Sequence, residues 1–509
     1  MENLLTGASA AEEVQETEAG IFAFDNTYAR LPARFLARVP PTPVPAPQLI
    51  QVNRALAAEL GIDADRLASP SGVAILAGNS VPSGAEPIAM AYAGHQFGQF
   101  VPSLGDGRAL LPGEVIGRDG QRKDIQLKGS GQTPFSRRGD GRAVIGPVLR
   151  EYILAEAMAA LGIPTTRALA AVTTGERVWR ERPLPGAILT RVASSHIRIG
   201  TFQYFAARQD IEAIKILSDY AIARHYPEVT GASNPVLAFF DNVVSRQAEL
   251  IAKWMLVGFI HGVMNTDNMS VSGETIDYGP CAFLDAYDPA KVFSSIDAYG
   301  RYAYGNQPAI AQWNLTRFAE ALLPVLGDDV NQAAGQVQEL IDAFPARFEA
   351  AYAHSVRPKL GLFQEEPDDV KLANELLECM ARNKADFTLT FRGLCEAAAG
   401  PENDDAISSL FADPAQFEAW ALKWRQRLER ESVAPEQRMT EMRKANPAFI
   451  PRNHLVEEAI AAAQDHGNFG PFRNLLNVLS TPFEDQSAAE RYTLPPRPDQ
   501  IVHQTFCGT

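Results

Sequence analysis

The sequence is short of basic residues. Its 509 residues include 46 lysines and arginines against 61 aspartates and glutamates, which gives a formal net charge of −15. Proteins that bind nucleic acid generally present basic surfaces to the phosphate backbone. The acidic balance therefore argues against a general nucleic-acid-binding protein, although it is compatible with a local basic pocket for phosphates.

Cysteine is also scarce. No C-x-x-C spacing occurs among the four cysteines, Cys281, Cys379, Cys395 and Cys507. Neither a zinc site nor a disulfide framework is therefore indicated. The first twenty residues contain five glutamates and no lysine or arginine, which argues against a secretory signal or a mitochondrial presequence. We expect a cytoplasmic protein in a reducing compartment, with a mobile acidic tail at residues 1–20.

Long apolar runs are absent as well. The most apolar stretch, Leu250 to Met264, is interrupted by Lys253 and His261 and is too short to span a bilayer. We therefore expect no membrane association. A chain of 509 residues exceeds one ordinary hydrophobic core, so two or three lobes are expected.

The segment from His261 to Gly279 carries the clearest chemical pattern, H-G-V-M-N-T-D-N-M-S-V-S-G-E-T-I-D-Y-G. Alternating residues at 269–272 and 275–277, separated by a Gly-containing turn, predict a short hairpin. Such a hairpin would bring Asn268 opposite Asp277. An amide oxygen and a carboxylate suit a hard cation such as Mg²⁺, and kinase-type enzymes hold their metals with this pair of residues.

One position departs from the kinase pattern. The residue two after the loop histidine, where kinases carry a base aspartate, is Val263. Valine cannot accept a proton, and Asp267 is the obvious substitute. Two alternatives remain: a coincidental Asn and Asp beside a surface hairpin, or a non-catalytic pseudokinase scaffold that binds nucleotide without modifying protein.

Three upstream segments carry candidate phosphate ligands. The first is Gly105-Asp106-Gly107-Arg108, which indicates either a hairpin turn or backbone N–H groups that approach a phosphate. The second is Lys128, at the end of a predicted strand, which we expect to pair with Glu151 on the predicted helix 148–158, as in kinases. The third holds Arg191 and Arg198, whose guanidinium groups suit polyphosphate oxygens or are ordinary surface charges.

Beyond residue 201 the chain is predicted to be mainly helical. Apolar residues recur at three- and four-residue spacing in eight segments, 209–225, 241–263, 309–325, 330–354, 369–382, 384–398, 414–432 and 453–466. The segment from residue 494 to the end is predicted to be extended and mobile.

Three blocks closely resemble the selenoprotein O family: Y-A-G-H-Q-F-G at 92–98, L-K-G-S-G-Q-T-P-F-S-R-R-G-D-G-R-A at 127–143, and H-G-V-M-N-T-D-N-M-S with T-I-D-Y-G-P at 261–280. The resemblance implies an α+β fold of the bilobal protein-kinase type. It implies a β-rich N-lobe at 21–200, a helical C-lobe with the metal-binding hairpin at 201–490, and a tail at 491–509.

The resemblance also implies an activity. Members of this family bind ATP in reversed orientation and transfer AMP to Ser, Thr or Tyr hydroxyls of proteins, and auto-modification is expected. Asp267 would be the proton acceptor, and Asn268 and Asp277 would hold Mg²⁺ or Mn²⁺. The residues implied in nucleotide binding are Gly105, Gly107, Arg108, Lys128, Asp140, Gly141, Glu151, Arg191, Arg198 and Asp277. A phosphotransferase acting on a small hydroxylated substrate is the enzyme alternative.

A redox role for the chain end is doubtful on the sequence. Some relatives carry a selenocysteine or cysteine third from the end, and the corresponding residue here is Cys507. In some bacterial relatives, that residue could pair with a second cysteine. That second position is occupied here by Phe293.

Overall fold

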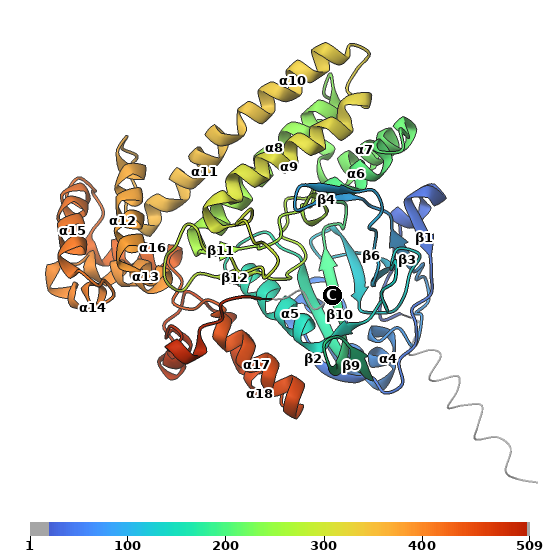
Figure 1. Ribbon diagram of the computed structural model, residues 1–509, viewed down its shortest axis with the longest axis horizontal. Helices are drawn as coiled ribbons and strands as arrows, with labels where there is room; N and C mark the ends of the chain where they lie inside the picture. Colours follow the sequence, from blue (N-terminus) through green and yellow to red (C-terminus); the bar gives the residue numbers. More distant parts are fainter. Residues whose placement is uncertain (1–19, 506–509) are drawn as a thin grey trace, which may run out of the picture.

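The computed structural model describes residues 20–505. The predicted acidic tail, apart from Gly20, and Cys507 lie outside this range. Strands gather in the N-terminal part of the chain and helices dominate the remainder (Figure 1), so the predicted α+β composition is confirmed. The likeness to protein kinases and the lobe boundaries stay predictions.

The main sheet has the strand order β1-β3-β6-β7-β10-β9-β2, with β8 paired to β10, and all of its pairings are antiparallel. Two small antiparallel pairs, β4–β5 and β11–β12, lie outside it. The strands are β1 (Leu36–Arg38), β2 (Gln48–Val52), β3 (Ile88–Met90), β4 (Gly94–Gln96), β5 (Gln99–Val101), β6 (Ala109–Ile116), β7 (Arg122–Lys128), β8 (Ala143–Val144), β9 (Arg167–Trp179), β10 (Pro183–Ala193), β11 (Phe259–Ile260) and β12 (Ala282–Phe283).

The sheet separates two groups of helices. Helix α5 (Ile145–Ala160) packs on one face, where Leu189 of β10 joins its hydrophobic core. Helices α2 (Arg54–Glu59), α3 (Ala64–Ala68) and α4 (Pro70–Leu76) contribute to the core on the other face, together with Ile188 of β10. Successive strand residues point to opposite faces, so Leu189 and Arg191 share the α5 face.

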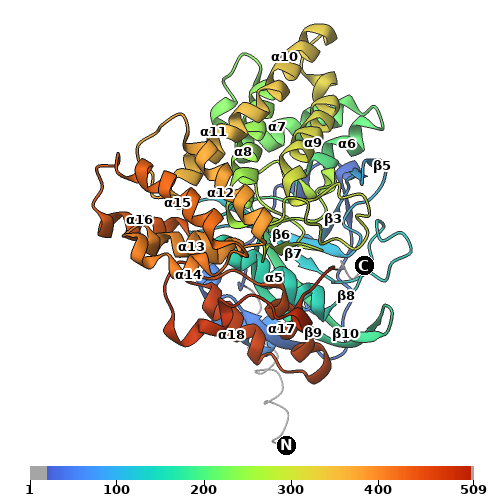
Figure 2. The ribbon, with the colours of Figure 1, turned by 60° about the vertical axis from the view of Figure 1, so that its left-hand side comes forward.

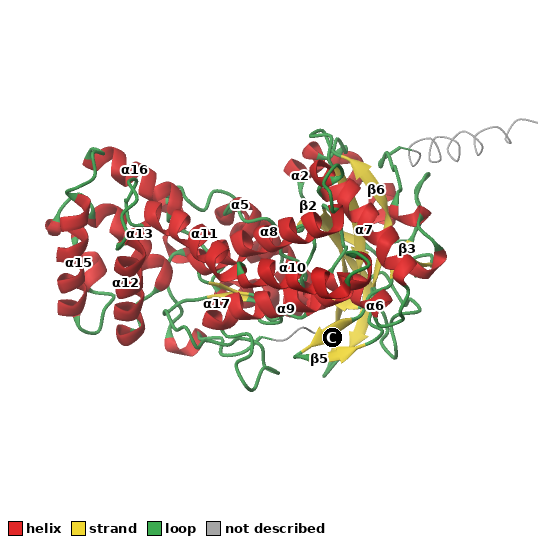
Figure 3. Ribbon diagram, turned by 90° about the horizontal axis from the view of Figure 1, so that it is seen from above, coloured by secondary structure: helices red, strands yellow, loops and turns green. Residues whose placement is uncertain are grey.

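The helices after the sheet form two groups. Those nearer the sheet are α6 (Ile199–Ala206), α7 (Ile211–His225), α8 (Pro235–Val257), α9 (Gln307–Leu322), α10 (Val330–Asp342) and α11 (Phe344–Lys359). The second group holds a separate hydrophobic core at the end of the molecule remote from the sheet (Figure 3). It comprises α12 (Asp369–Asn383), α13 (Phe387–Ala397), α14 (Asp405–Ser408), α15 (Pro414–Leu428) and α16 (Pro435–Ala445).

The last two helices return to the N-terminal part. Helices α17 (Asn453–His466) and α18 (Gly470–Leu479) pack on each other and on α5 (Figure 2). No helix among residues 20–505 is both long and apolar enough to cross a membrane.

The predicted hairpin at 269–277 is wrong. Its two halves form backbone bridges with other segments instead of with each other. Ser270 forms an antiparallel bridge with Arg198, and Thr275 forms a parallel bridge with Thr165. The apolar residues that alternate with polar ones in this segment, Met269, Val271 and Ile276, are all buried in the protein interior. They do not form one face of a two-stranded hairpin. The segment is therefore an internal loop held by neighbours on both sides.

The end of the chain, as far as the structure describes it, is attached to the protein. Thr505 is buried, its Oγ1 donates a hydrogen bond to Pro280 O at 2.7 Å, and its N–H donates to Phe293 O at 2.8 Å. The prediction of a mobile segment from residue 494 is therefore wrong at Thr505, which lies against the loop that follows Asp277.

Candidate active site

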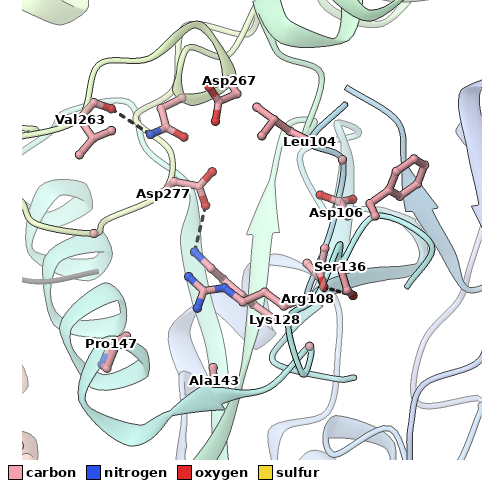
Figure 4. A pocket seen from close by; sticks show the side chains of 18 of the residues that line it. Leu104, Asp106, Arg108, Lys128, Ser136, Ala143, Pro147, Val263, Asp267 and Asp277 are labelled. Carbon is pink, nitrogen blue, oxygen red and sulfur yellow. Dashed lines mark hydrogen bonds and ion pairs between the residues drawn. The ribbon is translucent and has the colours of Figure 1, made fainter. Parts of the chain in front are cut away.

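All of the predicted site residues line a single cavity of about 1070 Å³. Figure 4 shows part of its wall, with Asp267 and Asp277 on one side and Arg108 and Lys128 on the other. The predicted residues in the lining are Gly105, Gly107, Arg108, Lys128, Asp140, Gly141, Glu151, Arg191, Arg198, Asp267, Asn268 and Asp277.

The sheet supplies two of the cations. Strands β7 and β10 pair so that Lys128 lies opposite Leu189, and Gln126 lies opposite Arg191. Because side chains alternate along a strand, Gln126 and Lys128 point to the cavity face while Leu127 joins the core on the opposite face. The amide oxygen of Gln126 accepts a hydrogen bond from Arg191 Nε at 3.0 Å and so fixes the guanidinium.

Helix α5 supplies the carboxylate that pairs with these cations. Glu151 Oε2 lies 2.6 Å from Lys128 Nζ, and Glu151 Oε1 lies 3.1 Å from Arg191 Nη1. Glu151 is buried among apolar residues of the same helix. The predicted Lys128–Glu151 ion pair is therefore present, and Arg191 extends it to a third charge.

Asp277 is the point at which the positive charges converge. Its Oδ1 lies 2.9 Å from Lys128 Nζ and 2.5 Å from Arg191 Nη1, and its Oδ2 is paired with Arg198. Burial by itself would raise the pKa of the Asp277 carboxyl, but Arg198, Lys128 and Arg191 outweigh burial and hold the pKa well below its ordinary value. The carboxylate is therefore ionised.

The backbone of Asp277 is strained. Its φ of +62° lies in the left-handed region, which non-glycine residues seldom adopt. Such conformations cost about 1–3 kcal/mol and persist where the surrounding structure enforces them, often at functional sites. Here the three cations hold the carboxylate in place.

Asp267 lies in a 3₁₀ turn, η4 (Thr266–Asn268), on the same side of the cavity as Asp277 (Figure 4). Its Oδ2 accepts a hydrogen bond from Gln96 Nε2 at 3.3 Å, whereas its Oδ1 is buried without a hydrogen-bond partner among the described residues. Burial raises the pKa of this carboxyl to about 6, although Arg198 opposes the shift. Asp267 therefore takes up a proton more readily than a solvated aspartate.

The β4–β5 hairpin holds this loop from the other side, a feature that the sequence analysis missed. The N–H groups of His95 and Phe97 donate to Thr266 Oγ1 at 2.7 Å and to Asn265 Oδ1 at 3.1 Å. A Cβ added to Gly94 would lie 2.5 Å from Asp267 Oδ1. The Gly- and aromatic-rich composition of residues 91–98 is typical of a tight turn but does not reveal its partner.

Two glycine-containing loops, the turn at 105–108 and the glycine loop at 131–141, form part of the cavity wall. Gly105 has a φ of +69°, and a Cβ at this position would overlap the Phe135 ring. Thr133 Oγ1 donates to Asp106 O at 2.7 Å, so the loop after Gly131 lies directly on the Gly105–Arg108 turn. The Asp140 carboxylate pairs with Arg180 at 2.7 Å.

Asp106 and Gln126 are two further residues of the site to which the sequence assigned no individual role. Asp106 is buried, and its Oδ2 accepts hydrogen bonds from Met90 N and from Gln126 Nε2. Burial raises the pKa of Asp106 to about 6 against the opposing charge of Arg198. Only the cross-strand register reveals this series of hydrogen bonds from Asp106 through Gln126 to Arg191.

The residues present fit a divalent cation that is shared with a substrate. Asn268 Nδ2 donates to Val263 O at 2.9 Å, so the amide oxygen is the atom left for a ligand. With Asp277 it would supply two oxygen donors, and Mg²⁺ commonly takes only one or two protein ligands beside substrate phosphates and water. No group of three or more His, Cys, Asp or Glu side chains that could hold a metal occurs within the described range.

Comparison with known proteins identifies the family. Residues 21–480 match the family model described as protein adenylyltransferase SelO. The protein nucleotidyltransferases YdiU of Methylorubrum extorquens (strain PA1) and of Bradyrhizobium diazoefficiens are both 62% identical to this chain, over 495 and 488 residues. That of Rhodopseudomonas palustris (strain BisB5) is 61% identical over 488 residues. Each alignment covers 96% of this chain and 99% of the relative. The chain therefore belongs to the SelO family of protein adenylyltransferases.

Proposed function

We propose that this protein is an adenylyltransferase that moves AMP from ATP to Ser, Thr or Tyr hydroxyls of proteins, itself included, and releases pyrophosphate. The observation that carries the proposal is the convergence of Lys128, Arg191 and Arg198 on Asp277 at the buried end of the cavity. Family membership and the names of the relatives support a nucleotidyl transfer to protein.

The charge distribution suits a reversed nucleotide in a kinase-like fold. Arg191 and Arg198 are both almost fully buried, so a polyphosphate that reached them would enter with its γ-end first. The α-phosphate would then lie nearer the loop that holds Asp267 and Asn268. Guanidinium and ammonium groups in such a water-poor place stabilise the charge that develops on a departing pyrophosphate.

The chemical step balances without any further reactant. The acceptor hydroxyl oxygen forms a bond to the α-phosphorus, and the bond from that phosphorus to the β-bridging oxygen breaks. Pyrophosphate leaves with the electron pair, and the hydroxyl proton passes to the carboxylate of Asp267, which lines the cavity. A Mg²⁺ or Mn²⁺ ion held by Asn268 and Asp277 would supply further charge stabilisation at the phosphate oxygens.

ATP labelled at either the α- or the γ-phosphate tests the proposal. We expect protein to retain the α label and lose the γ label, with a nucleotide-sized mass increase on the enzyme itself. Retention of the γ label alone would instead indicate a phosphotransferase. A chain that binds ATP but incorporates neither label would be a pseudokinase scaffold, as Val263 allows.

A further inference from the structure

A tryptophan lies exposed at the outer end of the same cavity. Trp179, the last residue of β9, lines the cavity wall and is 71% exposed. The other four tryptophans lie within the described residues and are buried or half-buried. Isolated exposed apolar side chains are common on proteins, so exposure alone does not assign a role. The position of Trp179 on the wall of the candidate active site adds a second observation.

The backbone beside Trp179 is held in place from two directions. Trp179 pairs with Pro183 across the β9–β10 turn. Within that turn, Arg180 forms an ion pair with Asp140 at 2.7 Å, and Arg182 forms one with Asp465 of α17 at 3.3 Å. The indole is therefore open to solvent but mounted on an anchored turn, and Asp140 ties that turn to the glycine loop.

The cavity changes in character from one end to the other. At the Asp277 end, the cations Arg191 and Arg198 are almost fully buried, and burial is what suits them to a polyanion held away from water. Trp179, Arg137 and Arg138, which line the same cavity, are by contrast exposed. A nucleoside triphosphate has the matching asymmetry, because one end is a polyanion and the other is a flat aromatic base.

We propose that Trp179 is the platform on which the base of the bound nucleotide stacks, and that it favours a purine over a pyrimidine. The inference rests on the proposed function, in which the triphosphate points to Asp277. An aromatic side chain can stack on the face of any base, and a purine presents the larger face. Trp179 thereby contributes to affinity for ATP and to its discrimination from UTP.

Tryptophan fluorescence gives a direct test in the full-length protein. Trp179 is the most exposed indole of the five, so a base stacked on it should quench its emission. We expect ATP to quench the wild-type protein and inorganic tripolyphosphate, which has no base, to bind without quenching. Trp179→Phe should lose the ATP-dependent signal. Trp313→Phe, which alters a half-buried tryptophan on α9, should retain it.

Calorimetry separates affinity from signal. We expect Trp179→Ala to weaken ATP binding about tenfold, to weaken UTP binding less, and to leave tripolyphosphate binding unchanged, while Trp179→Phe keeps most of the affinity for ATP. Unchanged ATP affinity in Trp179→Ala, or a quench that persists in Trp179→Phe, would overturn the platform. AMP transfer with unchanged ATP affinity in Trp179→Ala would refute the platform and leave the proposed function standing. ATP binding with quenching but without any AMP transfer would support the platform and refute the proposed function.

Discussion

The ammonium group of Lys128 lies 2.6 Å from the carboxylate of Glu151, and both side chains are largely withdrawn from solvent at the cavity wall. The two residues come from β7 and α5, so this pair joins the sheet to the helix that covers it. The same carboxylate also pairs with Arg191. Glu151 therefore compensates two positive charges of the site.

Replacing Glu151 with alanine should destabilise the fold. Removing one partner of a buried ion pair leaves an uncompensated charge and costs about 3–5 kcal/mol. We expect Glu151→Gln to cost less, because the amide still accepts a hydrogen bond. Urea denaturation measures the effect. As a control, Glu458→Ala breaks an exposed pair with Arg491 and should cost less than about 1 kcal/mol. Equal losses in the two alanine variants would contradict this account.

Asp277→Asn should abolish AMP transfer and strengthen metal-free binding of ATP. The substitution removes the charge that Lys128, Arg191 and Arg198 now neutralise, so these cations become available to phosphate oxygens. Asparagine tolerates the left-handed backbone of this position better than most residues, which limits strain. Calorimetry with ATP and a chelator, together with a transfer assay, tests both parts. Full transfer activity would rule out Asp277 as a functional carboxylate.

Gly94→Ala should impair transfer without loss of ATP binding. The added Cβ would lie 2.5 Å from Asp267 Oδ1 and 2.9 Å from Asp267 Cβ, so the proposed proton acceptor must move. A displacement of about 1 Å can cost on the order of 100-fold in rate. The matched control is Gly231→Ala, where nothing lies within 4 Å of the added atom. Wild-type turnover in Gly94→Ala would show that the position of Asp267 does not matter.

Titration of Lys359 should make the free energy of unfolding depend on pH. Burial lowers the pKa of its ammonium group to about 7, and its Nζ donates a hydrogen bond to Ala445 O at 3.2 Å. Between pH 7 and pH 10 the unfolded chain therefore holds a proton that the folded chain lacks. Stability should rise with pH across this window, by at most about 1.4 kcal/mol per unit, and level off below pH 7.

Lys359→Met tests this linkage. The variant has no charge to bury, so its gain in unfolding free energy over wild type should be larger at pH 7 than at pH 9. Urea midpoints at the two pH values give the comparison. A gain that is the same at both would show that Lys359 does not titrate in the folded protein.

Much of the site could be predicted from the sequence because its residues lie in local patterns. The glycines at 105 and 107, the strand lysine and the helix glutamate each occupy a short segment with a recognisable backbone preference. The resemblance of three blocks to one family then assembled these segments into a single site, and the cavity lining is consistent with that assembly. The helical region after residue 201 was predictable for a similar reason, since its periodicity is local.

The sequence pattern failed where the outcome depended on distant partners. Residues 269–277 alternate as a hairpin would, but Arg198 and Thr165 take the hydrogen bonds that the two halves would have exchanged. Gly94 and Gln96 are unremarkable in a turn, and only the packing of β4 against η4 places them on Asp267.

The sequence by itself determined the α+β composition, the family and the residue types gathered at the site, because propensity, periodicity and motif identity are properties of neighbouring residues. Tertiary structure alone decided that Asp277 faces three cations, that Asp267 keeps an unpartnered oxygen, and that Trp179 stands open at the far end of the cavity. Those relationships join segments up to 171 residues apart, and they arise from strand register and burial, which no local pattern encodes.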